Sequence, residues 1–190
     1  MRCIWVMYRR PLGVSEKVMQ KLSRCGDFLH CEVFCPDLVH EGKVGCTFTN
    51  FSMCDMMRTR ECLASYVVDH DKYMYHRIFL DPVQFDKFIS WNDRQVNHKC
   101  KYNYSDLCRQ MIPAVIAQNI TREVDMSKLY HQKLYCSQAV VLALRASLGL
   151  DHIVCKALAP VTSRLSTPSI VSKHLSAVLG APIQLPLLSY

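Results

Sequence analysis

LYCSQAVVLAL, at residues 134–144, places a cysteine at the start of a strongly apolar run. The apolar pattern continues to Leu148 and is followed by Gly149, so it predicts a helix over residues 134–148. A thiol in the first turn of a helix lies near the positive end of the helix dipole and near backbone N–H groups without helical partners. Both features lower the pKa of a thiol, and the N–H groups can hold an oxyanion. Cys136 is therefore the leading candidate for a nucleophile, and the alternative is a buried core thiol.

The composition fits one globular domain over residues 1–190, since the chain has 190 residues of which 50% are hydrophobic and 21% charged. No apolar stretch approaches the roughly 20 residues that span a bilayer, and the opening residues lack the features of a signal peptide. We expect a cytoplasmic protein whose 11 cysteines are mostly free thiols. The net charge of +7 is scattered without a basic block, so no specific nucleic-acid partner is expected. Nothing in the sequence indicates an oligomeric state.

The remaining patterns predict an antiparallel sheet with additional helices, which is an α+β fold. Strands are expected over residues 2–10, 28–35, 44–51, 63–68 and 73–80, with turns at 36–37 and 41–43. Helices are expected over residues 14–24, 82–96 and 169–179. The last two begin with an N-cap residue followed by proline, which is a strong helix start. The tail over residues 181–186 is expected to lie extended over the body.

A nucleophilic cysteine needs an imidazole within hydrogen-bond reach. Among the eight histidines, His30 stands out because it begins the strand expected over residues 28–35. Side chains alternate along a strand, so His30 and Glu32 share one face, and a helix packed there would bring Cys136 to His30. The alternative is a structural histidine at a strand edge. His174 is expected on the solvent face of the last helix.

Two segments together resemble the circularly permuted NlpC/P60 cysteine hydrolases of the YiiX/YaeF-like kind. FLHCEVF at residues 28–34 is similar to the histidine-bearing strand of that group, and LYCSQAV at residues 134–140 resembles its nucleophile helix. Histidine precedes cysteine here, as it does in the permuted group. KYNYSD at residues 101–106 and STPS at residues 166–169 are weaker similarities. The resemblance implies a papain-like fold, in which the nucleophile helix packs against an antiparallel sheet.

The chemistry that this resemblance implies is attack by the Cys136 thiolate on an amide, ester or thioester carbonyl. His30 would take the thiol proton and return it to the leaving group, and the backbone N–H of Cys136 would be one oxyanion donor. A third, polar residue usually orients the histidine in such enzymes. Asn50, Thr49 and Glu32 are all candidates for this role. No cofactor and no metal are implied.

The resemblance implies a protein, peptide or acylated substrate, and an intracellular protease, deubiquitinase-like or acyl-hydrolase role. Cysteines and hydrophobic residues replace the Gly-rich, acidic stretches that often surround the histidine strand in the family, so the substrate pocket departs from the family pattern. The compact chain would suit a viral protein that acts in the host-cell cytoplasm. Tyr102 and Tyr104 are candidate hydroxyl donors to the oxyanion, with simple packing as the alternative.

Two other interpretations stay open. One is a zinc site in the first third of the chain, where seven candidate ligands lie. They are Cys25, His30, Cys31, Cys35, His40, Cys46 and Cys54. Zinc sites use four such ligands at tight paired spacings, whereas the spacing here is irregular. The other interpretation is a catalytically inactive papain-like module that serves as a binding or scaffold protein.

Overall fold

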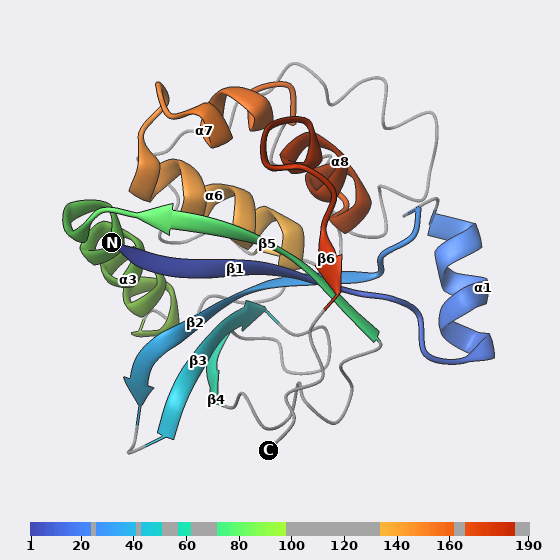
Figure 1. Cartoon of the computed structure of the whole chain (residues 1–190). Helices are drawn as coiled ribbons and strands as arrows, with labels where there is room; N and C mark the ends of the chain where they lie inside the picture. The colour runs from blue at the N-terminus through green and yellow to red at the C-terminus, as the bar shows by residue number, and fades with distance from the viewer. Residues whose placement is uncertain are drawn as a thin grey trace.

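The computed structural model of the chain describes residues 1–23, 26–40, 43–50, 57–61, 72–97, 134–161 and 166–184. These residues form an α+β fold (Figure 1). The strands are β1 (Arg2–Arg9), β2 (His30–His40), β3 (Lys43–Asn50), β4 (Met57–Glu61), β5 (Tyr73–Leu80) and β6 (Ile183–Gln184). The helices are α1 (Val14–Ser23), α3 (Pro82–Asn97), α6 (Cys136–Leu148), α7 (Ile153–Leu158) and α8 (Pro168–Leu179).

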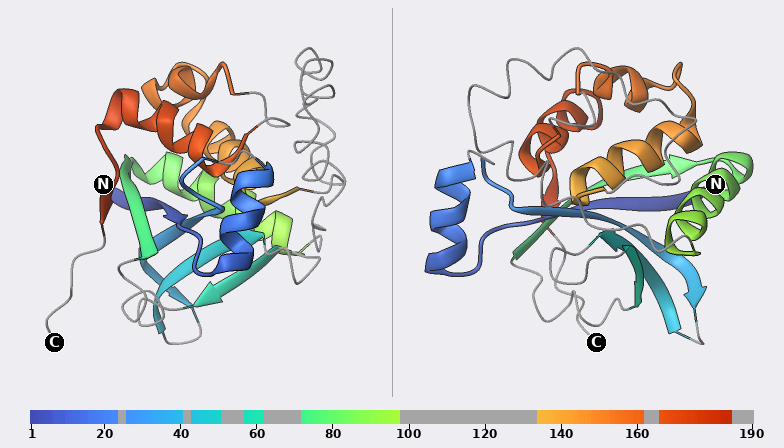
Figure 2. Two further views of the ribbon diagram at one scale, coloured as in Figure 1. Left: turned by 90° about the vertical axis from the view of Figure 1, so that its right-hand side faces the viewer. Right: turned by 180° about the vertical axis from the view of Figure 1, so that it is seen from behind.

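The described strands form a six-stranded sheet in the order β4-β3-β2-β1-β5-β6, and every neighbouring pair is antiparallel. Helices α6, α7 and α8 lie over one face of this sheet, as the views in Figures 1 and 2 show. Helix α1 lies beyond the end of the sheet where β1 finishes and β2 starts, and α3 lies at the opposite end. The start of β2 is therefore close to both α1 and the helical layer.

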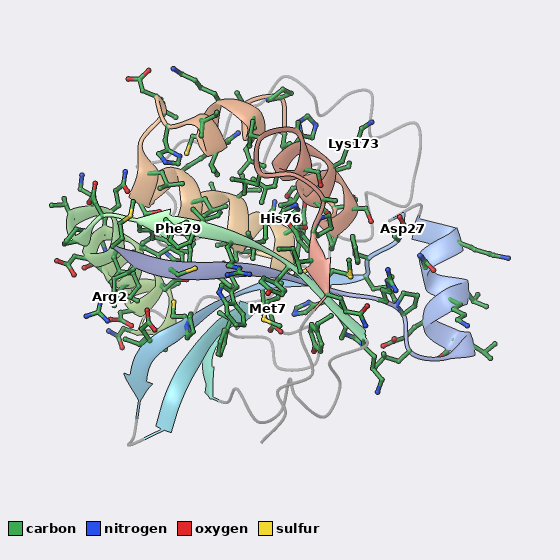
Figure 3. The ribbon with its side chains drawn as sticks, viewed as in Figure 1. Arg2, Met7, Asp27, His76, Phe79 and Lys173 are labelled. Carbon is green, nitrogen blue, oxygen red and sulfur yellow. The ribbon has the colours of Figure 1, made fainter. Side chains whose placement is uncertain are left out.

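The two faces of the sheet bury different side chains. On the helix-facing side, alternate residues of β1 and β2 join the apolar residues of α6 in the main core. These strand residues are Ile4, Val6, Tyr8, Cys31, Val33 and Cys35. On the other side, Met7, Phe34 and Tyr75 form a smaller buried cluster against which Trp5 packs. Figure 3 shows this difference, with His76 on the helix side of the sheet and Met7 on the opposite side.

Helix α6 confirms the helix predicted from the apolar run and begins two residues later, at Cys136. Tyr135 is its N-cap residue, and the Tyr135 carbonyl accepts a hydrogen bond from Ala139 N at 3.0 Å. The Gln138 side chain accepts a hydrogen bond from Tyr135 N at 3.1 Å, which ties the residue before the helix to its first turn. Gly149, with a φ of 77°, ends the helix as expected.

Strand β2 is longer than predicted, because it continues through Pro36 to His40. The turn expected at Pro36 and Asp37 was wrong. The pairing of β2 with β3 shifts register between Cys35 and Val39. A proline has no N–H to donate to a ladder, so a register shift is where a strand tolerates one.

The other predicted elements that fall on described residues are confirmed to within one residue at each end. Strand β4 and helix α7 were not predicted. The strand expected at residues 63–68 and the aromatic segment at 102–107 lie outside the described residues. No helix in the described part of the chain has the length and apolar character that a bilayer span needs.

Helix α1 has two apolar side chains, Val14 and Val18, that face solvent. Val14 and Val18, expected on one face of this helix, are 80% and 50% exposed. Glu16 lies on the other side of α1 and makes an ion pair at 3.1 Å with Arg9 at the end of β1. This ion pair is a polar contact between α1 and the end of β1.

Candidate active site

Cys136 is the first residue of α6 and only 4% exposed. Helix α6 packs on β2 and also touches α8. The Ser137 hydroxyl donates a hydrogen bond to the carbonyl of Ser166, just before α8 begins. This bond holds the first turn of α6 against the segment that leads into α8. The thiol is thus fixed at the junction of α6, β2 and α8.

The chain that leads into β2 is held at the same junction. Phe28 N donates a hydrogen bond to the Ser169 hydroxyl in the first turn of α8, at 2.9 Å. Gly26 has a φ of 71°, and a Cβ placed on it would lie 2.7 Å from Ser169 Cβ. Glycine is needed there both for its backbone conformation and for this close approach. Together these contacts fix where β2 begins, and His30 is its first residue.

The structure brings His30 and Cys136 together, with their side chains in hydrogen-bond contact. Burial opposes protonation of the imidazole. The negative charge of Cys136, the hydrogen bond to Cys136, and the hydrogen bond and charge of Glu32 outweigh burial and raise the pKa of His30 to about 10. The His30 side chain is 13% exposed, so water screens these interactions only weakly. His30 is therefore protonated at neutral pH.

The pKa of Cys136 shifts in the opposite direction. A hydrogen bond from the Cys31 side chain, the positive charge of His30, a hydrogen bond from His30 and the Cys31 backbone N–H lower the pKa of the Cys136 thiol. Burial raises it, but the combined stabilisation of the thiolate holds the pKa well below its ordinary value of 9.0. The opposite shifts of the two pKa values favour a thiolate–imidazolium ion pair between Cys136 and His30.

Glu32 is the third member of the cluster. Its carboxylate Oε2 lies 3.5 Å from His30 Nε2, and the Glu32 side chain is 1% exposed. Two side chains on one strand face point in parallel in an ideal strand, so this contact is closer than the sequence argument allowed. His30 begins β2, and its position at the strand end leaves room for that approach. Thr49 and Asn50 lie in the neighbouring strand β3, but their side chains lie outside what the structure describes.

Replacing Glu32 with glutamine is expected to lower the pKa of His30 by about one unit. The change keeps the size of the side chain but removes the negative charge that favours the imidazolium. The pKa is measured by following the imidazole resonances of His30 by NMR as a function of pH. Asp37→Asn is the matched control, since Asp37 is an exposed carboxylate on the same strand, and it should leave the pKa of His30 unchanged. Equal effects of both changes would contradict the role assigned to Glu32.

A second carboxylate lies in the electrostatic field of His30. Glu16 on α1 is partly buried, which raises its pKa, but the Leu12 N–H, the Arg9 guanidinium and the charge of His30 together lower it. Arg9 of β1 is the register partner of His30 of β2. The Arg9–Glu16 ion pair therefore flanks the imidazole and anchors α1 beside the site.

Cys31 contacts the nucleophile directly, a role that sequence analysis did not give it. Its side chain, fully buried, makes a hydrogen bond with Cys136. The helix was expected on the strand face of His30, whereas alternation puts Cys31 on the other face, which is the one that packs against the helices. Burial, this hydrogen bond and the charge of Cys136 raise the pKa of Cys31 well above 9.0, so Cys31 remains a thiol.

Three other histidines have structural roles. His76 is buried, and its Nδ1 lies 3.0 Å from the Tyr8 hydroxyl while its Nε2 lies 3.0 Å from the Gly180 carbonyl oxygen. His152 caps α7 by accepting a hydrogen bond from Val154 N at 3.3 Å. His174 is half-buried and its Nδ1 donates to the carbonyl of Ala157 at 2.9 Å, so the solvent-facing position expected for it was wrong.

Within the described ranges, no group of three or more histidine, cysteine, aspartate or glutamate side chains is arranged to hold a metal ion. The candidate zinc ligands Cys25 and Cys54 lie outside the described residues, and the side chains of His40 and Cys46 are not described either. Tyr102 and Tyr104 also lie outside them. What the described residues do bring together is a thiol, an imidazole and a carboxylate, from Cys136, His30 and Glu32.

Comparisons of the chain with family models, curated proteins and solved structures found no match. The chemistry of the site has to be argued from its own geometry. A buried thiolate at a helix N-terminus, beside an imidazolium that a carboxylate contacts, can attack a carbonyl carbon and then supply a proton to the leaving group.

Proposed function

We propose that the protein is a cysteine-dependent hydrolase with a papain-like active site. The observation that carries this proposal is the contact between Cys136 and His30, which come from a helix start and a strand start that are 106 residues apart (136 − 30). Burial raises the pKa of the Cys155 thiol even though the nearby charge of Arg145 lowers it. The lowered pKa of Cys136 therefore sets it apart as the activated nucleophile.

In this mechanism the Cys136 thiolate attacks the substrate carbonyl carbon and forms a tetrahedral intermediate. The His30 imidazolium protonates the leaving group as it departs, and an acyl thioester on Cys136 remains. His30, now neutral, takes a proton from water, which attacks the thioester and releases the acid. Glu32 stabilises the positively charged form of His30 in both halves of the reaction.

The first turn of α6 supplies the oxyanion site in this proposal. The first backbone bond of the helix is donated by Ala139, so the N–H groups before it have no helical carbonyl to bond. The N–H of Cys136 is the donor nearest to the attacking sulfur. The positive end of the α6 dipole adds to the stabilisation of the oxyanion.

The low exposure of the site limits the shape of the substrates that can reach Cys136. Cys136 is 4% exposed and the His30 side chain 13% exposed, so only a narrow group can reach the sulfur. Extended peptide segments with small side chains, and unbranched acyl thioesters, meet that requirement. A protein, peptide or acylated substrate is therefore part of the proposal.

The proposed function is tested by labelling the protein with electrophilic probes built on a peptide, on a ubiquitin-type C-terminus and on a thioester. At least one probe is expected to modify Cys136 in preference to the other cysteines, and Cys136→Ala should abolish that labelling. Mass spectrometry of the labelled peptides identifies the modified residue. If every probe labels Cys136 no faster than Cys155, the protein is not a thiol hydrolase and a binding role takes precedence.

The ion pair predicts an unusual pH dependence for the alkylation of Cys136 by iodoacetamide. At pH values between the lowered pKa of Cys136 and the raised pKa of His30, Cys136 is a thiolate in this proposal. The rate of its alkylation should therefore be constant over that pH range. As the pH passes about 10, His30 loses its proton, the thiolate is no longer paired, and the rate should rise again. An ordinary thiol shows one rise near pH 8.5 to 9. A single rise for Cys136 in that region would contradict the ion pair.

A further inference from the structure

Two cysteine sulfurs meet at the site, and hydrolysis uses only one of them. Cys31 on β2 is fully buried and Cys136 at the start of α6 is nearly so. Their side chains are in hydrogen-bond contact, with the Cys31 S–H as donor and the Cys136 thiolate as acceptor. Both are free thiols in the structure. The second thiol is thus already in contact with the sulfur that carries the negative charge.

We propose that Cys31 and Cys136 form an oxidative modification site, in which a hydroperoxide oxidises the Cys136 thiolate and Cys31 closes a disulfide onto it. This inference rests on the thiolate of the proposed function. It assigns to the same cluster a second reaction, with a hydroperoxide in place of a carbonyl substrate.

The first step makes a sulfenic acid. The Cys136 thiolate attacks one peroxide oxygen and the O–O bond breaks, which leaves Cys136 as the sulfenic acid. The departing oxygen takes a proton from the His30 imidazolium and leaves as water or, from an organic hydroperoxide, as an alcohol. Hydrogen peroxide is a small molecule, which suits a thiol that is only 4% exposed.

The second step makes the disulfide. Cys31 Sγ attacks the Cys136 sulfur, the S–O bond breaks, and hydroxide leaves as water with the proton of the Cys31 thiol. Two thiols have then given up two electrons, and the hydroperoxide has taken them. The bond requires the two Sγ atoms to approach to about 2.05 Å from hydrogen-bond contact. A dithiol reductant reverses the reaction.

The geometry favours Cys31 over other partners for the sulfenic acid. A thiol held in contact reacts as if at a very high local concentration, so it precedes capture by a reagent from solution. Cys155 is also buried but hydrogen-bonds the carbonyl of Leu144, near the other end of α6. Cys155 is therefore the matched control for a buried thiol next to the same helix.

The test exposes the folded full-length chain to hydrogen peroxide near pH 7 in the presence of dimedone, which traps sulfenic acids. Unreacted thiols are then alkylated, and the peptides are mapped without reduction. In the wild-type chain we expect a disulfide-linked peptide pair containing Cys31 and Cys136, with little dimedone on Cys136. In Cys31→Ser, the dimedone adduct at Cys136 should increase about tenfold, because no thiol is left to compete. Cys155→Ser should behave like the wild-type chain.

The wild-type experiment alone can overturn the inference, so it does not depend on the folding of a variant. If Cys136 accumulates the dimedone adduct or its higher oxides in the wild-type chain and no Cys31–Cys136 pair forms, Cys31 does not resolve the sulfenic acid. In that case iodoacetamide still reacts rapidly with Cys136, and the proposed hydrolase stands. If peroxide and iodoacetamide both fail to react with Cys136, the thiolate is absent and both proposals fail.

Discussion

His30→Ala is expected to slow the alkylation of Cys136 by iodoacetamide about 10- to 100-fold near pH 6. In the wild-type protein the Cys31 hydrogen bond, together with the positive charge and hydrogen bond of His30, holds the pKa of Cys136 well below 9.0, which favours the thiolate. Without the imidazolium, only the hydrogen bonds from Cys31 remain to oppose burial, so a smaller fraction of Cys136 is ionised at this pH. An ordinary thiol of pKa about 8.5 is only about 0.3% ionised at pH 6. The weaker nucleophilicity of a low-pKa thiolate offsets part of this difference.

The rate is measured on the peptide that contains Cys136, by mass spectrometry of the intact protein's digest at successive times, because the chain has 11 cysteines. His152→Asn is the matched control. It removes another imidazole while keeping an N-cap side chain for α7, and it should leave the Cys136 rate unchanged. An equal rate in the wild-type chain and His30→Ala would mean that His30 does not activate the thiol.

Much of the central site could be predicted because its members carry local signals. Cys136 was identified from a cysteine at the start of an apolar run, and His30 from its place at the start of a strand. Their contact was expected from a helix packed on the strand face that His30 and Glu32 share. That expectation was wrong, because α6 packs on the face of Cys31 and Val33, while Phe34 lies in the cluster on the other face. His30 reaches Cys136 from its place at the start of β2. The catalytic roles of both residues remain part of the proposal.

Other features depend on packing that no local pattern encodes. Glu32 could not be separated from Thr49 and Asn50, because an ideal strand geometry does not predict its approach to His30. The outward apolar positions of α1 could not be predicted either, since Val14 and Val18 have the spacing of a buried face. The Arg9–Glu16 ion pair, which depends on where β1 ends, is one contact that α1 makes with the sheet.

The elements that were missed have weak sequence signals. Strand β4 reads MRTRE, in which charged residues replace the alternation that marks a half-buried strand. Helix α7 has six residues, which is too few to establish a helical period. The continuation of β2 through Pro36 depends on a register shift with β3 that becomes visible only when both strands are paired.

Leu144→Ala is expected to reduce the free energy of unfolding by about 3 kcal/mol, because a buried leucine loses its transfer energy and leaves a cavity. Leu144 lies fully buried on α6, the helix that contacts β2, α3 and α7. The loss corresponds to a change of roughly 100-fold in the unfolding equilibrium. It is measured by urea denaturation monitored by circular dichroism.

Leu150→Ala makes the same chemical change just beyond α6 at a side chain that is 77% exposed, and it should alter stability by less than about 0.5 kcal/mol. Leu144 lies eight residues from Cys136 (144 − 136). Cys136 in the folded fraction of Leu144→Ala should therefore still be alkylated at the wild-type rate near pH 6. Equal stability losses in the two variants would show that α6 is not the buried centre of the fold. A stability loss with an unchanged Cys136 rate would separate the packing of α6 from the electrostatics that His30 and Cys31 provide at its first residue.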